Sequence, residues 1–410
     1  MKGACIVGQS GGPTAVINAS LEGVIKAGFR NPDITKVYGA LNGIEGIINE
    51  QIIDFSDEDM DEIDRLRNTP SAALGSVRYY LSDDFDKDDS YQKILNTFKK
   101  YDIRYFFYIG GNDSMDSCHK IYQYLKANEY ECAVIGIPKT IDNDLVGCDH
   151  TPGYGSACKF ISTTINEIYL DTSSYKKGRV TIIEIMGRDA GWLTASSKLA
   201  SLNGADPDLI YLPEVPFDID AFLAEVKKIY EKKQKVLIAV SEGIKDKNGE
   251  YILKYRNFNN NDPFGHLQLG GVSSVLCEIV TNTLGFPVRA IELNLPQRCA
   301  AHIASLTDIQ EAYMCGKKAV DYATKGESGK MISLYRQNDV TRYSTVELSS
   351  VATLIKTVPE SFITPSGNQI TEEYIKYALP LIQGESPISF RDGLPLFTKL
   401  KKKIVKIENV

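Results

Sequence analysis

Two short polar segments, each placed after an apolar run, carry the residue types that phosphate chemistry needs. Ile109-Gly110-Gly111-Asn112-Asp113-Ser114 follows one run, and Pro138-Lys139-Thr140-Ile141-Asp142-Asn143-Asp144 follows another. The apolar runs predict buried strands, and the ligand crevice of an open α/β sheet lies at the carboxyl ends of its strands. Glycines there let a phosphate approach the backbone, a lysine supplies positive charge, and carboxylates bind a metal or accept a proton. This set of residues predicts phosphoryl transfer.

The two acids of the second segment suggest separate tasks. Asp142 and Asp144 stand two residues apart, with Lys139 beside them. One carboxylate can accept the proton of an attacking hydroxyl, and the other can support a metal or a neighbouring group. An isolated Asp-x-Asp is more typical of a solvated turn. The preceding strand and the lysine favour the functional interpretation here.

Other candidate residues also stand at predicted junctions between elements. Gly8-Gln9-Ser10-Gly11-Gly12-Pro13 closes an N-terminal strand and precedes a helix, which makes either an anion site or a tight turn. Met186-Gly187-Arg188 follows a strand, and the fixed fork of donors on arginine suits a phosphoryl group. Together with these, the arginines near other junctions predict a sugar-phosphate site: Arg78, Arg179, Arg289 and Arg298. The four histidines have no metal-ligand spacing and receive no catalytic role.

Strand-like and helix-like runs alternate through most of the chain, which predicts an α/β fold with parallel sheets covered on both faces. The predicted strands are 4–7, 105–109, 133–137, 180–186, 209–212, 236–240 and 289–293, and the predicted helices are 15–27, 114–127, 156–169, 221–232 and 307–322. Residues 245–263 are polar and predict a loop or hairpin. Beyond about Ser350 the pattern weakens, and the lysine-rich tail 399–406 is interpreted as a solvated face.

Composition limits the function classes. At 410 residues the chain is long enough for two domains, and a net charge of −7 with a pI of about 5.4 gives no support for a nucleic-acid or acidic-membrane surface. No apolar stretch is long enough to span a bilayer. The eight scattered cysteines lack zinc spacing and are interpreted as reduced, which suits a cytoplasmic location.

With these motifs the chain resembles the phosphofructokinase family over about residues 1–345. The strings that carry the resemblance are Pro-x-Thr-Ile-Asp-Asn-Asp, at 138–144, and Met-Gly-Arg, at 186–188. The resemblance implies an α/β fold of two doubly wound, mainly parallel-sheet domains with the active site between them. It implies a phosphoryl-donor domain, 1–155 plus 297–347, and a sugar-phosphate domain, 156–296 plus 348–410 with a C-terminal extension. It also implies a homodimer or homotetramer.

The resemblance implies a role for each matching residue. Asp142 would be the base that takes the proton from the 1-hydroxyl of fructose 6-phosphate, and Arg188 would stabilise the transferring group. Thr140 and Asp144 would position the sugar and Mg²⁺. The remaining contacts follow by position: Gly11 and Arg78 for the donor phosphates, Met186, Gly187 and Glu242 for the sugar, and Arg289 and Arg298 for the 6-phosphate, with Arg179 contributed by a neighbouring subunit.

Asp113 and Lys139 favour pyrophosphate as the donor. ATP-using members that resemble the bacterial enzyme carry glycine at both positions. A carboxylate at Asp113 would lie where the α-phosphate of ATP must pass, and Lys139 would neutralise a leaving phosphate. The expected products are fructose 1,6-bisphosphate and phosphate, as in the pyrophosphate-dependent branch of the family.

Three departures from the family pattern affect these expectations. Asn112 stands where most relatives have an acid that contacts magnesium, so direct coordination by Asn112 is left open. Leu295 replaces a histidine that contacts the 6-phosphate. Glu22 occupies the position of an effector-binding arginine, which predicts that the allosteric site is absent.

Several alternatives stay open at this point. Within the family they are an ATP-dependent phosphofructokinase and a pyrophosphate kinase that accepts sedoheptulose 7-phosphate. A nicotinamide-dependent oxidoreductase is a third, although the dinucleotide glycine pattern is missing. A non-catalytic regulatory paralogue is a fourth, and the presence of Asp142, Asp144 and Lys139 argues against it.

Overall fold

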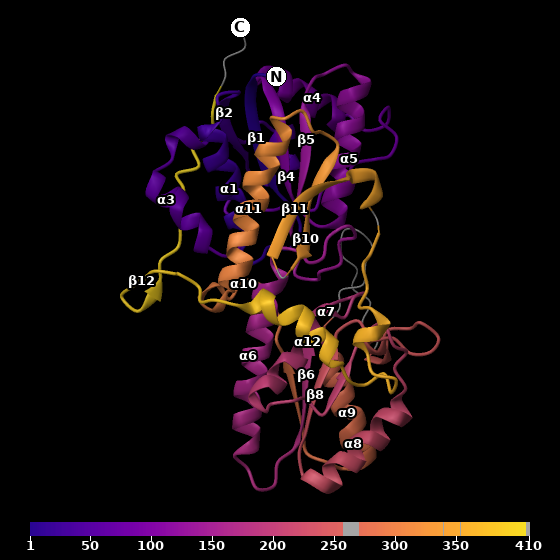
Figure 1. Ribbon diagram of the computed structural model, residues 1–410. Helices are drawn as coiled ribbons and strands as arrows, with labels where there is room; N and C mark the ends of the chain where they lie inside the picture. Colours follow the sequence, from indigo (N-terminus) through magenta and orange to yellow (C-terminus); the bar gives the residue numbers. More distant parts are fainter. Residues whose placement is uncertain (257–269, 339, 353, 407–410) are drawn as a thin grey trace.

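The computed structural model has two α/β lobes, one above the other in Figure 1, and describes residues 1–256, 270–338, 340–352 and 354–406. Each lobe is built on its own sheet. Among the described residues, the helices lack the combination of length and apolar character that a membrane crossing requires. All eight cysteines are free thiols.

The larger sheet forms the first lobe. Its strand order is β11-β10-β5-β4-β1-β2-β3, with antiparallel pairs at the two edges, β10–β11 and β2–β3, and parallel pairs between them. The central strands are buried on both faces, which explains why they read as continuous apolar runs. The bounds are β1 Gly3–Gln9, β2 Ile34–Ala40, β3 Ile52–Asp54, β4 Ile103–Gly110, β5 Ala133–Pro138, β10 Lys330–Gln337 and β11 Val340–Glu347.

Two helices of the first lobe, α1 (Ile17–Arg30) and α11 (Leu306–Ala323), lie side by side (Figure 1). Gly23 and Gly316 permit this close approach, because a Cβ at either would overlap the backbone of the other helix. The remaining helical segments of the lobe are α2 Ile44–Ile48, η1 Phe55–Asp57, α3 Met60–Arg65, η2 Leu66–Asn68, α4 Ser90–Lys100, α5 Asn112–Ala127 and η6 Leu348–Ser350.

The smaller sheet forms the second lobe. Its order is β7-β8-β6-β9 and all of its pairs are parallel. The strands are β6 Val180–Ile185, β7 Leu209–Tyr211, β8 Val236–Ser241 and β9 Val288–Glu292. The helical segments beyond the first sheet are α6 Tyr154–Ser173, α7 Trp192–Ala195, η3 Ser196–Asn203, α8 Ile219–Lys233, η4 Ile252–Arg256, α9 Val272–Leu284, α10 Pro296–Cys299, η5 Ala301–Ile303, η7 Glu360–Phe362, α12 Glu372–Ala378 and η8 Leu379–Ile382.

The C-terminal part visits both lobes. Helix α12 packs in the hydrophobic core of the second lobe. Val405 N, in contrast, donates to Ile52 O at 2.8 Å beside the first sheet. Between them a short hairpin, β12 (Phe390–Arg391) with β13 (Leu394–Pro395), protrudes at the left of Figure 1. The lysine side chains of the tail are exposed, as the solvated-face interpretation expects. The domain boundaries given above stay a prediction.

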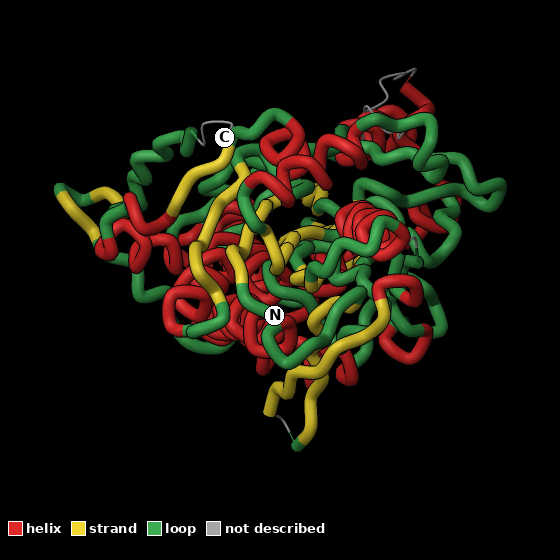
Figure 2. Tube along the Cα trace, turned by 90° about the horizontal axis from the view of Figure 1, so that it is seen from above, coloured by secondary structure: helices red, strands yellow, loops and turns green. Residues whose placement is uncertain are grey.

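The predicted fold class is confirmed. The bounds of each predicted strand and helix lie within a few residues of those of an observed strand or helix. Figure 2 views the same layered arrangement from above. Six strands of the described chain were not predicted from the sequence: β2, β3, β10, β11, β12 and β13. The predicted loop or hairpin at 245–263 begins with an antiparallel bridge between Lys245 and Tyr251, and its part beyond 256 lies outside the described residues.

Candidate active site

The carboxyl ends of the two sets of parallel strands face one another between the lobes. The segments after β1, β4 and β5 come from the first lobe, and those after β6, β8 and β9 come from the second. The charge of Glu242 on the second lobe acts on Asp142 of the first, and Arg298 lies 3.1 Å from the position a Cβ would take on Gly12. The fold therefore brings the candidate residues that follow these strands together between the two lobes.

The turn after β1 and the lysine after β5 lie together, where the resemblance predicts the donor phosphates; we call this part of the site the donor side, and the part where the resemblance predicts the sugar the acceptor side. Gly11 has φ +72°, a left-handed conformation that favours glycine, and a Cβ there would lie 3.3 Å from Lys139 Nζ. Lys139 Nζ donates to Gly12 O at 2.6 Å. Burial lowers the pKa of Lys139 to about 8, although the Asp142 carboxylate opposes that shift. The turn thus presents backbone and a buried ammonium group to the same space.

The Thr140–Asp144 loop holds its shape through its own side chains. Asp142 N donates to Thr140 Oγ1 at 3.1 Å, and Thr151 Oγ1 donates to Thr140 O at 2.9 Å. Asn143 has φ +54° and is fully buried, and its Oδ1 accepts from Thr151 N at 3.1 Å. The buried Asn143 leaves the flanking carboxylates of Asp142 and Asp144 at the crevice.

The two carboxylates of this loop hold protons more strongly than in water. Burial raises the pKa of Asp142, and the Glu242 carboxylate adds to the rise, while Lys139 and Arg188 oppose it. Burial also raises the pKa of Asp144, and the charge of Asp142 contributes. A carboxylate with a raised pKa is a better proton acceptor, which is what a general base needs.

Asn112 and Asp144 have the chemistry of a hard-cation site. Asn112 Nδ2 donates to Asp144 Oδ2 at 2.9 Å, while Asn112 Oδ1 is buried and finds no hydrogen-bond partner within the described chain. An orphaned amide oxygen beside a carboxylate fits Mg²⁺, which usually keeps several waters and binds through one or two carboxylates and substrate phosphates. No group of three or more His, Cys, Asp or Glu side chains in the described ranges could hold a metal.

The acceptor side is built from the segments after β6 and β8. Gly187 has φ +134°, its N donates to Glu242 Oε1 at 3.2 Å, and its O accepts from Ser241 Oγ at 2.5 Å. Gly243 packs against the backbone of the Met-Gly-Arg loop, because a Cβ at this position would overlap Arg188 O. Burial raises the pKa of Glu242 to about 7. These contacts fix the Met-Gly-Arg loop against the strand that carries Glu242.

Gln297 fixes the third part of the acceptor side. It is buried, its Oε1 accepts from Met186 N at 3.2 Å, and its Nε2 donates to Asn294 O at 2.9 Å. The next residue, Arg298, is half-buried beside Gly12, and burial lowers its pKa. Gln297 therefore links the segment after β9 to Met186, a contact that the sequence analysis did not predict.

The remaining candidates fall into two groups. Arg78 is exposed, and its charge lowers the pKa of both Lys139 and Arg298. Asp113 is exposed in the first turn of α5, which follows β4. Arg179 precedes the first residue of β6, and Arg289 pairs in register with Thr181 near that same end. At about 3.3 Å per residue, the 179–186 stretch spans roughly 23 Å. Arg179 and Arg289 therefore lie at the amino ends of the strands of the second sheet, whereas Met186 lies beyond their carboxyl ends.

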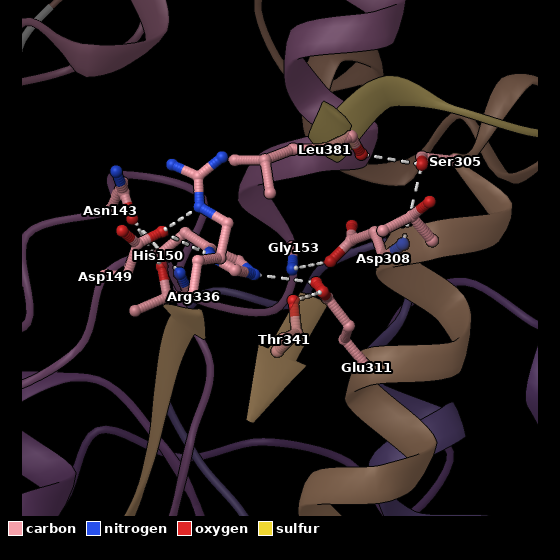
Figure 3. Close-up of polar contacts among 12 residues, drawn as sticks. Asn143, Asp149, His150, Gly153, Ser305, Asp308, Glu311, Arg336, Thr341 and Leu381 are labelled. Atoms are coloured by element: carbon pink, nitrogen blue, oxygen red, sulfur yellow. Dashed lines mark hydrogen bonds and ion pairs between the residues drawn. The ribbon is translucent and has the colours of Figure 1, made fainter. Parts of the chain in front are cut away.

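A cluster outside the predicted site residues supports the loop that follows them (Figure 3). His150 is buried, with Nδ1 2.8 Å from Asp149 Oδ1 and Nε2 2.8 Å from Glu311 Oε2. Arg336 donates to the same Asp149 oxygen at 2.8 Å, and Thr341 donates to Glu311 at 2.5 Å. Burial lowers the pKa of His150, but the two carboxylates outweigh burial and raise it to about 9. The cluster ties the loop to α11 and to the β10–β11 hairpin.

Glu22 lies in an internal ion-pair cluster. Its side chain is 1% exposed and accepts from Arg67 Nε at 2.7 Å and Arg67 Nη2 at 2.9 Å, and it pairs with Lys26 at 2.7 Å. Lys26 also pairs with Asp64 at 2.6 Å. Lys26 and Arg67, the two cations that contact Glu22, are therefore already bound to carboxylates. The absence of allosteric control stays a prediction, with internal ion pairing as its physical basis.

Comparison with known proteins identifies the family. The phosphofructokinase family model matches residues 4–323, and the chain belongs to the phosphofructokinase family. It is 42% identical over 401 residues to a Halomonas elongata protein named pyrophosphate–fructose 6-phosphate 1-phosphotransferase, covering 96% of this chain and 95% of that one. The family match gives no support to the nicotinamide-dependent alternative.

Two further relatives bear on fold and acceptor. The solved structure of a pyrophosphate-dependent phosphofructokinase from Nitrosospira multiformis superposes with a TM-score of 0.90 at 36% identity, covering 100% of this chain and 99% of that chain. An Alkalicoccus urumqiensis protein named sulfofructose kinase is 35% identical over 333 residues, covering 81% of this chain and 83% of that one. Each is a protein that this chain resembles.

Proposed function

We propose that this chain transfers a phosphoryl group reversibly between pyrophosphate and the 1-hydroxyl of fructose 6-phosphate, giving fructose 1,6-bisphosphate and phosphate. The observation that carries the proposal is the buried Lys139 ammonium group, placed between the Gly11–Gly12 turn and the Asp142 carboxylate. The named relatives, at 36–42% identity over nearly the whole chain, support the same donor and acceptor.

The residues divide the chemistry between them. Asp142 takes the proton of the 1-hydroxyl while that oxygen bonds to phosphorus, and the bridging P–O bond of pyrophosphate breaks to release phosphate. Lys139 stabilises the negative charge that builds on the leaving phosphate, and Arg188 stabilises the transferring group. Gly11 and Arg78 bind the donor phosphates. The raised pKa of Asp142 supports its assignment as the base.

Mg²⁺ belongs to the donor side. Asp144 and Asn112 would hold it, because a carboxylate and a buried unpartnered amide oxygen lie together there. When bound, the ion supplies charge neutralisation for the phosphate oxygens. Thr140 supports the loop that presents Asp144, since its hydroxyl accepts from Asp142 N.

The acceptor is held by the Met186–Arg188 loop, Glu242 and Arg298. The Glu242 carboxylate can accept hydrogen bonds from sugar hydroxyls, and the half-buried Arg298 can hold the 6-phosphate. Leu295 is exposed and supplies no cation to that phosphate. Two other acceptors should be compared with fructose 6-phosphate. Sedoheptulose 7-phosphate is the alternative that the sequence left open, and sulfofructose is the acceptor in the name of the Alkalicoccus urumqiensis relative.

A second copy of the chain supplies Arg179 and Arg289 to this site in our proposal. Both lie near the amino end of β6, whereas the 6-phosphate that they are predicted to bind would lie beyond the carboxyl ends of the strands. A homodimer or homotetramer would bring these arginines from one subunit to the 6-phosphate of the next. The acidic net charge supports no nucleic-acid partner, and the free thiols fit a cytoplasmic location.

A donor comparison tests the function. Purified protein is assayed with fructose 6-phosphate and Mg²⁺, using pyrophosphate, ATP or GTP as the donor, and Asp113→Gly serves as the matched variant. We expect turnover with pyrophosphate alone in the wild type, and added ATP turnover in Asp113→Gly because a carboxylate is removed from the donor side. Wild-type turnover with ATP at the pyrophosphate rate would favour the ATP-dependent alternative, and no turnover with any donor would favour the regulatory paralogue.

A further inference from the structure

Residues 355–358 form a segment that bonds to loops of both lobes. Ile355 forms an antiparallel bridge with Leu145, and Lys356 N donates to Asp144 O at 2.7 Å. These backbone contacts extend the end of the Thr140–Asp144 loop. We call residues 355–358 the linking segment.

The side chain of Lys356 reaches into the same loop. Its Nζ donates to Asp149 O at 2.9 Å, to Cys148 O at 3.0 Å and to Asn143 Oδ1 at 3.3 Å. An ammonium group has three donors, and all three find acceptors here. Asn143 is the buried, left-handed residue between the two site carboxylates. The lysine therefore holds the inner side of the loop in one shape.

The other side of the linking segment contacts the acceptor side. Trp192 Nε1 donates to Lys356 O at 2.8 Å, and the Lys356 Nζ lies 5.0 Å from the centroid of the Trp192 ring. Val358 N and Gly191 N both donate to Glu214 Oε1, at 2.9 and 2.8 Å. Gly191 and Trp192 lie three and four residues after Arg188 in the chain. One short segment thus bonds to the loop that carries the base and to Trp192, at the start of the helix that follows the Met186–Arg188 loop.

We propose that Lys356 is a positioning residue that couples the Met186–Arg188 loop of the second lobe to the Thr140–Asp144 loop of the first, so that the base and the acceptor keep their relative placement. The role rests on the proposed function, which places the base on one loop and the sugar on the other. Lys356 touches neither substrate in this account.

The acceptors of Lys356 separate a positioning role from a purely structural one. All three are neutral oxygens, and two keep another donor when the ammonium group is removed: Asp149 O accepts from Tyr377 OH at 2.8 Å, and Asn143 Oδ1 accepts from Thr151 N. A buried cation that binds neutral groups carries a desolvation cost. Replacing it with an apolar side chain of similar length should therefore change stability little while loosening the loop.

Lys356→Met is the test variant and Lys198→Met is its control. Lys198 is buried and donates to Asp206 at 2.8 Å rather than to either loop. We expect Lys356→Met to lower kcat about 10- to 100-fold, the cost of a small misplacement of reacting groups, with each KM changed less than about threefold. The melting temperature should stay within about 3 °C of the wild type, and Lys198→Met should keep the wild-type kcat.

The single tryptophan gives a second readout. Because Trp192 is the only one in the chain, its fluorescence reports on the contact with Lys356. We expect magnesium pyrophosphate alone to change the fluorescence of the wild type, and Lys356→Met to lose that response while keeping the response to fructose 6-phosphate. An unchanged pyrophosphate response in the variant, no response in the wild type, or a kcat within twofold of wild type would each overturn the coupling.

Hydrogen exchange separates this proposal from the proposed function. We expect faster amide exchange across 140–151 in ligand-free Lys356→Met than in the wild type, with Lys198→Met unchanged. Equal exchange in the wild type and Lys356→Met would overturn the positioning role even if the wild type uses pyrophosphate. Absence of pyrophosphate turnover in the wild type, with the exchange difference present, would overturn the proposed function and leave the contact between segment and loop established.

Discussion

Removing the charge of Lys139 should damage donor cleavage and change the pH profile together. Lys139 is 3% exposed, its Nζ donates to Gly12 O at 2.6 Å, and the Asp142 carboxylate lies close enough to affect its pKa. Lys139→Met keeps most of the side-chain volume and removes only the cation. The buried position means that little solvent replaces the lost charge.

The expected loss can be stated in magnitude. A preorganised donor aimed at developing charge contributes about 10²- to 10³-fold in kcat, or roughly 3–4 kcal/mol. A unit charge about 4 Å away at an effective dielectric constant of about 20 gives about 4 kcal/mol, which agrees. Burial lowers the pKa of Lys139 to about 8, so the active ammonium form is present below that pH and is lost as the pH rises through it. Wild-type kcat/KM for pyrophosphate, which reports the ionisations of the free enzyme, should therefore fall on the alkaline side of about pH 8.

The assay is pyrophosphate-dependent turnover from pH 6 to pH 9.5, at saturating fructose 6-phosphate and varied pyrophosphate so that kcat and kcat/KM are both obtained, for the wild type, Lys139→Met and Lys139→Arg. Lys139→Met should lose activity and the alkaline limb together. Arginine stays protonated over this range, so Lys139→Arg should keep more activity than methionine and should show no limb near pH 8. A kcat within threefold of wild type in Lys139→Met, or an alkaline limb at the same pH in that variant, would refute the role of Lys139.

Three further outcomes follow from the site and its supports. Asp142→Asn should lower kcat about 10²- to 10⁴-fold with a much smaller change in calorimetric affinity for fructose 6-phosphate, and a near-normal kcat would remove Asp142 as the base. The pKa of His150 is raised from 6.5 to about 9, so its stabilising contribution is full below about pH 6.5 and is lost as the pH rises through about 9. In urea unfolding, His150→Gln should cost on the order of 3 kcal/mol more at pH 6 than at pH 9.5, and an equal cost at both would contradict this. Because the Glu22 carboxylate already pairs with Lys26 and Arg67, the fructose 6-phosphate kinetics should be hyperbolic and unaffected by ADP or phosphoenolpyruvate. Sigmoidal kinetics that ADP relieves, and that are lost in Glu22→Ala, would contradict this prediction.

Local sequence was sufficient for the residues that follow strands. A βα turn places its loop at a sheet edge whatever the rest of the chain does, so Gly11, Asp113 and Asp142 could be assigned to one edge before any tertiary contact was known. Arg188 and Glu242 follow the same rule on the second sheet. The meeting of the two edges, by contrast, was an expectation that came only from the family resemblance.

Long-range contacts were beyond the reach of the sequence. Lys356 follows a stretch with no clear periodicity, and its partners lie more than 160 residues away in the chain. Strand β11 carries exposed and half-exposed side chains, and the buried stretch of β10 covers only Met331–Leu334 and includes Ser333, so neither strand has the longer apolar run that marks a buried strand. His150 received no role because its two carboxylate partners include Glu311, which no local pattern pairs with it.

The paired charges at Glu22 show a related limit. The sequence predicted an unfavourable charge for an anionic effector. Lys26 stands four residues after Glu22 in the predicted helix, which indicates a local ion pair, but nothing in the sequence indicated that Arg67 would also pair with Glu22. The same conclusion about regulation now depends on occupied cations. Electrostatic arguments from single residues are therefore weaker than those from strand ends, because charge depends on neighbours supplied by the fold.

Label transfer in the reverse direction tests the central claim most directly. Fructose 1,6-bisphosphate, ³²P-labelled phosphate and Mg²⁺ are incubated with the purified chain in the absence of nucleotides, and the phosphorus compounds are separated. If the chain carries out the proposed reaction, the label enters pyrophosphate while fructose 6-phosphate forms in equal amount, and Asp142→Asn suppresses both. Label that never leaves phosphate, or fructose 6-phosphate that forms only when ADP is added, would contradict the account.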